Sequence, residues 1–268
     1  MNKALKIASW NVNSLKVRID QVLELLQSSE LDVLALQETK LTDPNFPLQA
    51  FHDLGFHVVF SGQKTYNGVA VISREPLHDV ITDVPNLIDP QRRILATTIG
   101  NLRIINLYVP NGSEVNSEKY LYKLDWLEKV TTFIHQQMQQ YPDVIVLGDF
   151  NIAPDDRDVH DPLAWEGCVL VSPAERAALA DLLALGLHDS FRLFTQPEQQ
   201  FSWWDYRAAA FRRNRGLRID LILLTHSLQS QCLESQINVI PRHDERPSDH
   251  APVWVSLRQN FDEKSNMY

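Results

Sequence analysis

The chain has 268 residues, of which 44% are hydrophobic and 22% charged, and its formal net charge is −9. This composition is typical of a folded globular protein and excludes the collagen-like, disordered and disulfide-scaffold classes. No stretch approaches the roughly 18 consecutive apolar residues of a membrane span, and the N-terminus has no apolar signal core, so we expect a cytoplasmic protein with no membrane partner. Cys168 and Cys232 lie far apart and indicate neither a zinc site nor a disulfide framework.

Short apolar runs alternate with helical patterns along the chain, and no low-complexity tract or linker divides it. Several of these runs are bounded by turn residues, which is typical of β-strands. We expect strands over residues 6–10, 32–38, 58–61, 68–73, 94–99, 102–109, 143–149, 219–224 and 253–257.

Three segments have the apolar spacing or the end signals of a helix. The first places four apolar residues on one face: Ile19, Val22, Leu23 and Leu26. The second covers 117–141, with Leu121, Leu124, Ile134 and Met138 among its apolar positions. The third begins at Ser172 with a Ser-Pro-Ala-Glu capping box and ends before Gly186. The number of strands exceeds what one doubly wound sheet needs, so we expect an α/β fold with two facing sheets and helices outside.

Two of the expected strands share a pattern that ends in an acid. The runs that begin at Asp32 and Asp143 both read Asp-Val followed by apolar residues, with a carboxylate six positions on, at Glu38 and Asp149. A buried strand that ends in this way projects its acid at the edge of a sheet, where ligand sites gather in layered folds. The pattern indicates two similar halves that meet at one polar site; the alternative is that both acids merely begin loops.

Other polar residues interrupt or end apolar runs, and as a set they are rich in oxygen and poor in sulfur. Such donors suit Mg²⁺, which needs only one or two carboxylates besides a substrate phosphate. Asp220 lies inside an apolar strand, and a buried carboxylate needs a partner. His250 is a candidate, because a carboxylate would fix the tautomer of the imidazole and favour its cation. The alternative is that His250 is purely structural.

The net negative charge argues against a nucleic-acid partner, but one segment is strongly basic. Five arginines and no acid lie between positions 207 and 219: Arg207, Arg212, Arg213, Arg215 and Arg218. A polyanion responds to the local patch that it meets rather than to the total charge. The segment is therefore a candidate for phosphate contact, with solvated surface as the alternative.

Six motifs, taken in order, resemble the exonuclease III family, whose members are apurinic/apyrimidinic (AP) endonucleases of the endonuclease/exonuclease/phosphatase superfamily. Five are Ser-Trp-Asn-Val-Asn-Ser-Leu at 9–15, Leu-Gln-Glu-Thr at 36–39, Tyr-Val-Pro-Asn at 108–111, Gly-Asp-Phe-Asn-Ile-Ala at 148–153 and Ser-Asp-His-Ala-Pro-Val at 248–253. The sixth, Phe-Ser-Trp-Trp-Asp-Tyr-Arg at 201–207 with Asn-Arg-Gly-Leu-Arg-Ile-Asp-Leu at 214–221, resembles the bacterial members. The resemblance implies a four-layer α/β sandwich, two facing mixed β-sheets flanked by helices, as one domain over 1–258 with a C-terminal tail over 259–268.

The resemblance also implies roles for the residues at the motif positions. Glu38 would bind the metal, with Asn11 and Asp249 close to the same ion, and Asp149 and Asn151 would be further ligands if two metals bind. Asp149 would orient or deprotonate the attacking water, and Asn151 would hold that water and the scissile phosphate. His250, paired to Asp220, would hydrogen-bond a phosphate oxygen, and Tyr108 would contact the phosphate or help the leaving group. The implied cofactor is Mg²⁺, for which Mn²⁺ can substitute.

The implied substrate is double-stranded DNA with abasic sites or 3′ ends. Trp203, Leu217 and Ile219 match positions that line a small apolar pocket for a flipped-out sugar without its base, which is cheap to extrude. Contacts to the DNA backbone are expected from two further groups of residues. They are the arginines Arg207, Arg212, Arg213 and Arg215, and Tyr66, Asn67 and Asn111 with Lys64 and Arg92. Arg212 and Arg213 depart from the bacterial pattern, and a monomer is the family expectation.

Several functions remain open at this point. Inositol phosphatases, sphingomyelinases, deadenylases and pancreatic-type deoxyribonuclease would share the phosphoester-handling residues, and only 201–221 and 108–111 favour DNA repair. A non-catalytic damage-binding protein is an alternative of another class. Within the family, the activities are incision 5′ to an abasic site, 3′→5′ exonuclease, 3′-phosphatase and nicking at damaged bases. One alternative is a predominantly 3′-end-processing exonuclease with little AP-site incision.

Overall fold

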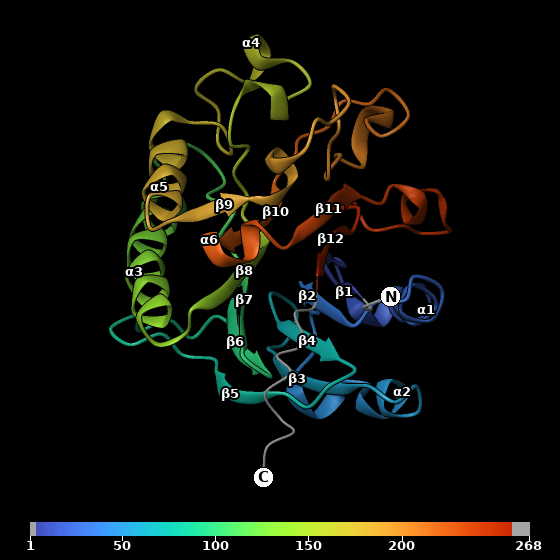
Figure 1. Cartoon of the computed structure of the whole chain (residues 1–268). Coiled ribbons are helices and arrows are strands. Elements are labelled where there is room, and N and C mark those ends of the chain that lie inside the picture. The colour runs from blue at the N-terminus through green and yellow to red at the C-terminus, as the bar shows by residue number, and fades with distance from the viewer. Residues whose placement is uncertain (1–3, 259–268) are drawn as a thin grey trace.

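Two six-stranded β-sheets pack face to face in the computed structural model, which describes residues 4–258 (Figure 1). Sheet A has the strand order β11 (Cys232–Ile237), β12 (Val253–Arg258), β1 (Ala4–Asn11), β2 (Val33–Gln37), β4 (Val69–Ser73) and β3 (His57–Ser61). Sheet B has the order β5 (His78–Ile81), β6 (Ile94–Ile99), β7 (Leu102–Tyr108), β8 (Asp143–Asp149), β10 (Asp220–Thr225) and β9 (Leu187–Asp189).

Helices cover the outer face of each sheet, which completes four layers (Figure 1). The helices are α1 (Leu15–Ser28), α2 (Leu48–His52), α3 (Glu118–Gln140), α4 (Pro162–Trp165), α5 (Pro173–Leu183) and α6 (His226–Gln229). Helices α1 and α2 lie on sheet A, and α3 and α5 lie on sheet B. The expected four-layer α/β sandwich of two mixed sheets is therefore confirmed.

Side-chain alternation along the central strands builds three apolar layers. On β8, Ile145 and Leu147 pack between the two sheets, whereas Val144 and Val146 pack under the helices of sheet B. A strand that is buried on both faces presents alternate residues to two different cores, so its sequence is continuously apolar. This explains why the apolar runs, rather than an alternating pattern, located the central strands.

The two similar halves expected from the Asp-Val pattern are present. Strands β1 and β2 pair in parallel and are joined by α1, and strands β7 and β8 pair in parallel and are joined by α3. In each unit the second strand leads to one of the two acids, Glu38 or Asp149. Because the ends of parallel strands lie at the same edge of a sheet, each unit projects its acid at the same end of the sandwich.

The sequence missed the strands β5, β9 and β11, which all lie at edges of a sheet. Part of each of these strands faces water, so none of them has a continuous apolar run. Of the apolar positions named for the second helix, Leu121 is exposed. The buried face of α3 is formed by Tyr120, Lys123, Trp126, Leu127, Val130, Phe133, Ile134 and Gln137.

The remaining end signals agree with the structure. The Ser172 side chain accepts a hydrogen bond from the amide of Glu175, and the Glu175 side chain accepts one from the amide of Ser172, so the capping box is formed. No helix within residues 4–258 has the length and hydropathy needed to cross a membrane. The tail expected over 259–268 lies outside the described residues.

Candidate active site

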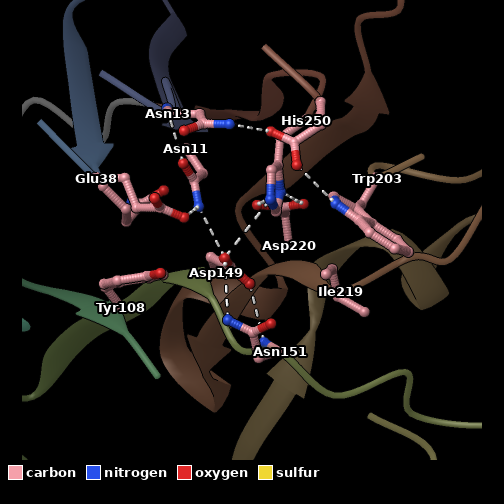
Figure 2. Close-up of polar contacts among 12 residues, drawn as sticks. Asn11, Asn13, Glu38, Tyr108, Asp149, Asn151, Trp203, Ile219, Asp220 and His250 are labelled. Carbon is pink, nitrogen blue, oxygen red and sulfur yellow. Dashed lines mark hydrogen bonds and ion pairs between the residues drawn. The ribbon is translucent and has the colours of Figure 1, made fainter. Parts of the chain in front are cut away.

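The motif residues meet at one end of the sandwich, where strands from both sheets terminate (Figure 2). Asn11 ends β1 and Glu38 directly follows β2 in sheet A, whereas Tyr108 and Asp149 end β7 and β8 in sheet B. Asp220 begins β10, which runs antiparallel to β8 and is paired with Asp149 in register. The β-α-β units thus bring together side chains that are more than 100 residues apart in the sequence.

Asn11 joins the acids of the two halves. Its Nδ2 donates hydrogen bonds of 2.9 Å to both Glu38 Oε1 and Asp149 Oδ2 (Figure 2). Its Oδ1 accepts one of 3.0 Å from the amide of Asn13, and the side chain is fully buried. One amide group therefore holds two carboxylates close together in a buried position, where each charge needs a donor or a cation.

Glu38 is held in its charged form by a lysine that follows it closely in the chain. Lys40 Nζ lies 2.9 Å from Glu38 Oε2 and also donates to Asn13 Oδ1. Burial by itself would raise the pKa of Glu38, but the Lys40 cation and the Asn11 hydrogen bond keep that pKa below its usual value. Lys40 was not singled out from the sequence, although it lies within the same short segment as Glu38.

His250 lies between two buried carboxylates. Its Nδ1 donates to Asp220 at 2.9 Å, and its Nε2 lies 3.7 Å from Asp149 Oδ2. Burial by itself lowers the pKa of His250, but Asp220 and Asp149 together raise it to about 10, so the imidazole is a cation at neutral pH. The structure thus places His250 beside Asp220, the partner suggested by the sequence.

Asp149 is surrounded by groups that act on its proton affinity in opposite directions. Burial is the largest influence and raises the pKa of Asp149 to about 7, while the His250 cation and the Asn11 hydrogen bond favour its ionised form. A carboxylate with a pKa near neutrality is matched to accepting a proton at physiological pH. Among residues 4–258, Asp149, Asp220 and His250 form the one group of three or more His, Cys, Asp or Glu side chains whose ligand atoms all lie within 4.8 Å of one another.

Asn151 and Tyr108 flank Asp149. The Asn151 amide donates to Asp149 Oδ1 at 2.9 Å, and its Nδ2 donates to Asp149 Oδ2 at 3.2 Å. Burial, followed by the charges of Glu38 and Asp149, raises the pKa of Tyr108 well above its usual value, so the phenol keeps its proton. Tyr108 and Asn151 are therefore hydrogen-bond donors at the edge of the site (Figure 2).

Asp249 is placed differently from the other expected metal ligands. Its Oδ1 accepts a 2.9 Å hydrogen bond from Asn13 Nδ2, and its Oδ2 accepts one of 3.0 Å from Trp203 Nε1. Asp249 is therefore linked to Glu38 through Asn13 and Lys40 rather than by a shared donor. Asn13 bonds both Lys40 and Asp249, a connecting position that its place in the motif did not reveal.

A polar cavity of about 460 Å³ adjoins Glu38 and Tyr108. Three residues expected to contact DNA line it, Tyr66, Asn67 and Asn111, and so do residues that the sequence did not single out: Gln63, Gln91, Arg93, Lys119 and Tyr122. The guanidinium of Arg93 lies over the Tyr108 ring, 4.6 Å from its centre. The expected contact Arg92 is not among the residues that line the cavity, and it pairs with the exposed Asp83 at 2.9 Å.

The apolar positions beyond Asp249 belong to one apolar cluster. Leu217 is fully buried and Ile219 is 1% exposed, and Trp203 is half-buried against them. The other members of this apolar cluster are Ala153, Val159, Leu170, Val171, Trp165 and Val169. The structure therefore brings the three expected pocket residues together, packed against residues of the loop over 159–171.

Four of the five arginines in the basic segment are exposed: Arg207, Arg212, Arg213 and Arg215. Arg207 pairs with Asp205 at 2.6 Å. Arg218 is instead 1% exposed and pairs with Asp158 and Asp189, so it belongs to the interior of the protein. The surface over 207–215, which we call the arginine segment, is thus positive and accessible.

Comparison with known proteins gives consistent matches over nearly the whole chain. The model of the endonuclease/exonuclease/phosphatase family matches residues 8–250. Exodeoxyribonuclease III of Haemophilus influenzae is 34% identical over 267 residues, which cover 95% of this chain and 100% of the relative. A 3′ phosphatase from Neisseria, solved with a product DNA hairpin, is 44% identical with a TM-score of 0.94 and covers 96% of this chain and 100% of its own. An AP endonuclease from Archaeoglobus fulgidus is 36% identical with a TM-score of 0.92, over 95% of this chain and 100% of its own.

Proposed function

Because this chain belongs to the endonuclease/exonuclease/phosphatase family, we propose that it is a metal-dependent hydrolase of phosphate esters in DNA. It acts at 3′ ends as a 3′-phosphatase and 3′→5′ exonuclease, and it incises duplex DNA 5′ to abasic sites. The relatives named as an exodeoxyribonuclease, a DNA-bound 3′ phosphatase and an AP endonuclease support this assignment.

The observation that carries the proposal is the position of Asp149 between a second carboxylate, Glu38, and the cation of His250. On one side Asn11 bonds Asp149 together with Glu38, and on the other side the His250 cation lies 3.7 Å away. A phosphodiester is anionic, so its hydrolysis needs a group that accepts a proton from water and fixed positive groups that stabilise charge on the phosphate oxygens. Both kinds of group are present within one buried site.

The donor set suits a hard divalent cation, and we propose Mg²⁺, for which Mn²⁺ can substitute. Glu38 and Asp149 are carboxylates that share a donor, and the side chains of Asn11 and Asn151 contact them. These oxygen-bearing residues would hold the ion, and Asp249 would support them through Asn13. When bound, such an ion polarises the phosphate and stabilises the leaving oxygen.

The residues around the phosphate then have distinct roles. Asp149 orients the attacking water and accepts its proton, for which a pKa of about 7 is suited. His250 donates from Nε2 to a phosphate oxygen, while Asp220 holds the ring through Nδ1 and stabilises its charge. Asn151 donates from its backbone and side-chain amides to Asp149 and so holds the carboxylate in place. The protonated phenol of Tyr108 donates to the phosphate or to the leaving oxygen.

We propose that duplex DNA spans the site between two surfaces. The polar cavity lined by Tyr66, Asn67 and Asn111 would receive the backbone on one side, and the arginine segment would contact phosphates on the other. Half or more of protein–DNA hydrogen bonds go to the phosphate and sugar, and they position the protein without reading sequence. An acidic protein can bind DNA through such a local basic surface.

A second candidate is a predominantly 3′-end-processing enzyme with little AP-site incision. The packing of Leu217 and Ile219 in the apolar cluster favours it, because an extruded sugar needs space beside these residues. A terminal 3′ phosphate needs no such space, since it can reach Asp149 from the end of a strand. The 44% identity to a 3′ phosphatase is consistent with this alternative.

The test compares three duplex DNA substrates at equal concentration: one with a 3′-phosphate, one with an undamaged recessed 3′ end and one with an internal abasic site. The products are followed over time with Mg²⁺ and in an EDTA control. Fast incision at the abasic site supports the full set of activities, and fast 3′-end processing with little incision supports the second candidate. Cleavage of none of the three would overturn the proposal.

Two further parts of the proposal concern the location of the protein in the cell and its oligomeric state. We propose that the enzyme works in the cytoplasm, where bacteria keep their chromosome, because the motifs over 201–221 resemble those of the bacterial members of the family. We propose that the protein works as a monomer, because one chain supplies every residue of the site. Sedimentation of the protein with and without DNA measures this directly.

A further inference from the structure

A buried lysine lies beneath the site and was not used in the proposed reaction. Lys123 is on α3, and its side chain is fully buried. Its Nζ donates to the backbone carbonyls of Asn151 at 2.7 Å and Asn111 at 3.1 Å, and to the carboxylate of Glu175 at 2.5 Å. An ammonium group has three donors, so all of them are satisfied by these three oxygens.

Both carbonyls belong to residues at the edge of the active site. Asn111 follows β7 and lines the polar cavity, and Asn151 follows β8. The two asparagines are also bonded through their side chains, since Asn111 Nδ2 donates to Asn151 Oδ1 at 3.0 Å. One ammonium group thus fixes the backbones of two loops whose side chains meet in the site.

Asn151 needs such a restraint because of its backbone conformation. Its φ is +50°, in the left-handed region, which asparagine adopts more readily than other L-residues but which still costs more than the right-handed region. In this conformation its amide donates to Asp149 Oδ1 and its side chain donates to Asp149 Oδ2. Contacts that over-determine a residue keep it in a sparsely populated conformation of this kind.

The partner Glu175 extends the restraint to the loop over the apolar cluster. Its Oε1 accepts from the amide of Leu170 at 3.1 Å, and its Oε2 accepts from the hydroxyl of Ser172 at 2.6 Å. The Ser172 hydroxyl also lies 2.7 Å from that of Tyr120 on α3. Burying an ion pair has a large desolvation cost, so such a pair often adds little to the stability of the fold. We therefore look for a role of the Lys123–Glu175 pair other than stability.

We propose that Lys123 and Glu175 are positioning residues for hydrolysis, which hold Asn151 and Asn111 at the geometry that the phosphate requires. Lys123 Nζ touches only oxygens of the protein, so it does not take part in the reaction itself. The inference rests on the proposed function for its kinetic consequences. Its structural consequence, a loosened backbone at Asn151 when Lys123 is removed, is independent of any activity.

The variants are chosen to separate positioning from stability. Lys123→Met leaves the Glu175 carboxylate buried without a cation, so it is made together with Glu175→Gln to remove both charges. Arg103→Met is the matched control, because Arg103 is another buried cation under α3 that bonds Gln137 at 2.8 Å. Arg103 lies near the start of β7, at the opposite end of that strand from Tyr108.

The first measurement is kinetic, on a duplex with a 3′-phosphate. A misplacement of catalytic groups by about 1 Å costs up to ~10²-fold in rate, so we expect kcat of the double variant to fall by ~10–10²-fold with little change in KM. Arg103→Met should keep the wild-type kcat even if its melting temperature falls by as much as that of the double variant. A double variant that keeps wild-type kcat, or a control that loses kcat equally, overturns the proposal.

The second measurement is native-state hydrogen exchange at the Asn151 amide, which donates to Asp149 Oδ1. Protection of this amide should fall in the double variant and persist in Arg103→Met. Unchanged protection in the double variant overturns the positioning role whether or not DNA is cleaved. An inactive wild-type protein would instead contradict the proposed function, and exchange would still decide the inference.

Discussion

His250 and Asp220 are joined by a buried hydrogen bond of 2.9 Å from Nδ1 to a carboxylate oxygen, which leaves Nε2 directed at Asp149. This geometry fixes which ring nitrogen faces the reaction and keeps both nitrogens protonated at neutral pH. The pair therefore supplies a fixed positive donor next to the group that is proposed to accept the proton of water.

Replacing Asp220 by Asn should move the alkaline limit of activity to lower pH. With Asp220 present the pKa of His250 is about 10, so the cation persists across the working range and is lost only as the pH rises through that value. Without the Asp220 charge the pKa falls, because Asp220 is the largest of the influences that raise it against burial. We expect kcat at neutral pH to fall by ~10²–10³-fold, as for other lost charge-stabilising donors. A pH–rate profile of Asp220→Asn measures the shift, and an unchanged alkaline limb would contradict this role.

Glu38→Ala and Asp149→Asn should respond differently to Mg²⁺. Glu38 is proposed as a metal ligand only, so its loss should be offset in part when Mg²⁺ is raised. Asp149 is also the proposed general base, a role worth ~10²–10⁴-fold, so Asp149→Asn should stay slow at every Mg²⁺ concentration. A Mg²⁺ titration of kcat for both variants tests this. Parallel curves would show that the two acids share one role.

Asn11→Asp should make the stability of the protein depend on a divalent cation. Asn11 Nδ2 donates to both Glu38 and Asp149, so an aspartate in its place puts a third buried carboxylate beside two others. Like charges in a buried site destabilise the folded state, and a bound cation relieves the repulsion. We expect a lower melting temperature than wild type in EDTA and a larger rise on adding Mg²⁺. Asn11→Ala is the control, because it removes the donor without adding charge.

DNA affinity should fall steeply with salt, and the arginine segment should account for part of the slope. Each phosphate contact contributes a slope of about −0.9 in log K against log salt. Arg212→Gln with Arg213→Gln should reduce the slope by up to about two if both exposed side chains contact phosphates. Lys129→Gln on the outer surface of α3 removes an exposed cation away from the site and should leave the slope unchanged. Equal slopes in all three proteins would show that Arg212 and Arg213 face solvent only.

The central strands and the acids at their ends followed from local pattern. Runs buried on both faces are apolar along their whole length, which is why β2 and β8 were located together with Glu38 and Asp149. Edge strands such as β11 lack this property, because part of the strand faces water. The exposed position of Leu121 shows the same limit for helices, since α3 buries the polar Lys123 and Gln137 in its place.

The site residues were likewise found where polar groups end apolar runs, but their contacts were not. Lys40, Arg93 and Lys123 look like ordinary solvated cations in the sequence, and their partners are brought near by the fold. The sequence does not distinguish the two members of the Arg-Arg pair at 92 and 93. In the structure Arg93 lines the cavity, whereas Arg92 pairs with Asp83.

The sequence by itself determined the family, the layered fold and the polar residues at the ends of strands, because these depend on motifs and on residue patterns within short segments. Only the tertiary structure decided that Asn11 bridges Glu38 and Asp149, that Leu217 and Ile219 are packed, and that Lys123 holds Asn151. Each of these contacts joins residues separated by 27 to 138 positions or depends on how a loop packs. The free energy of such a contact comes from burial and from partners that no local pattern contains.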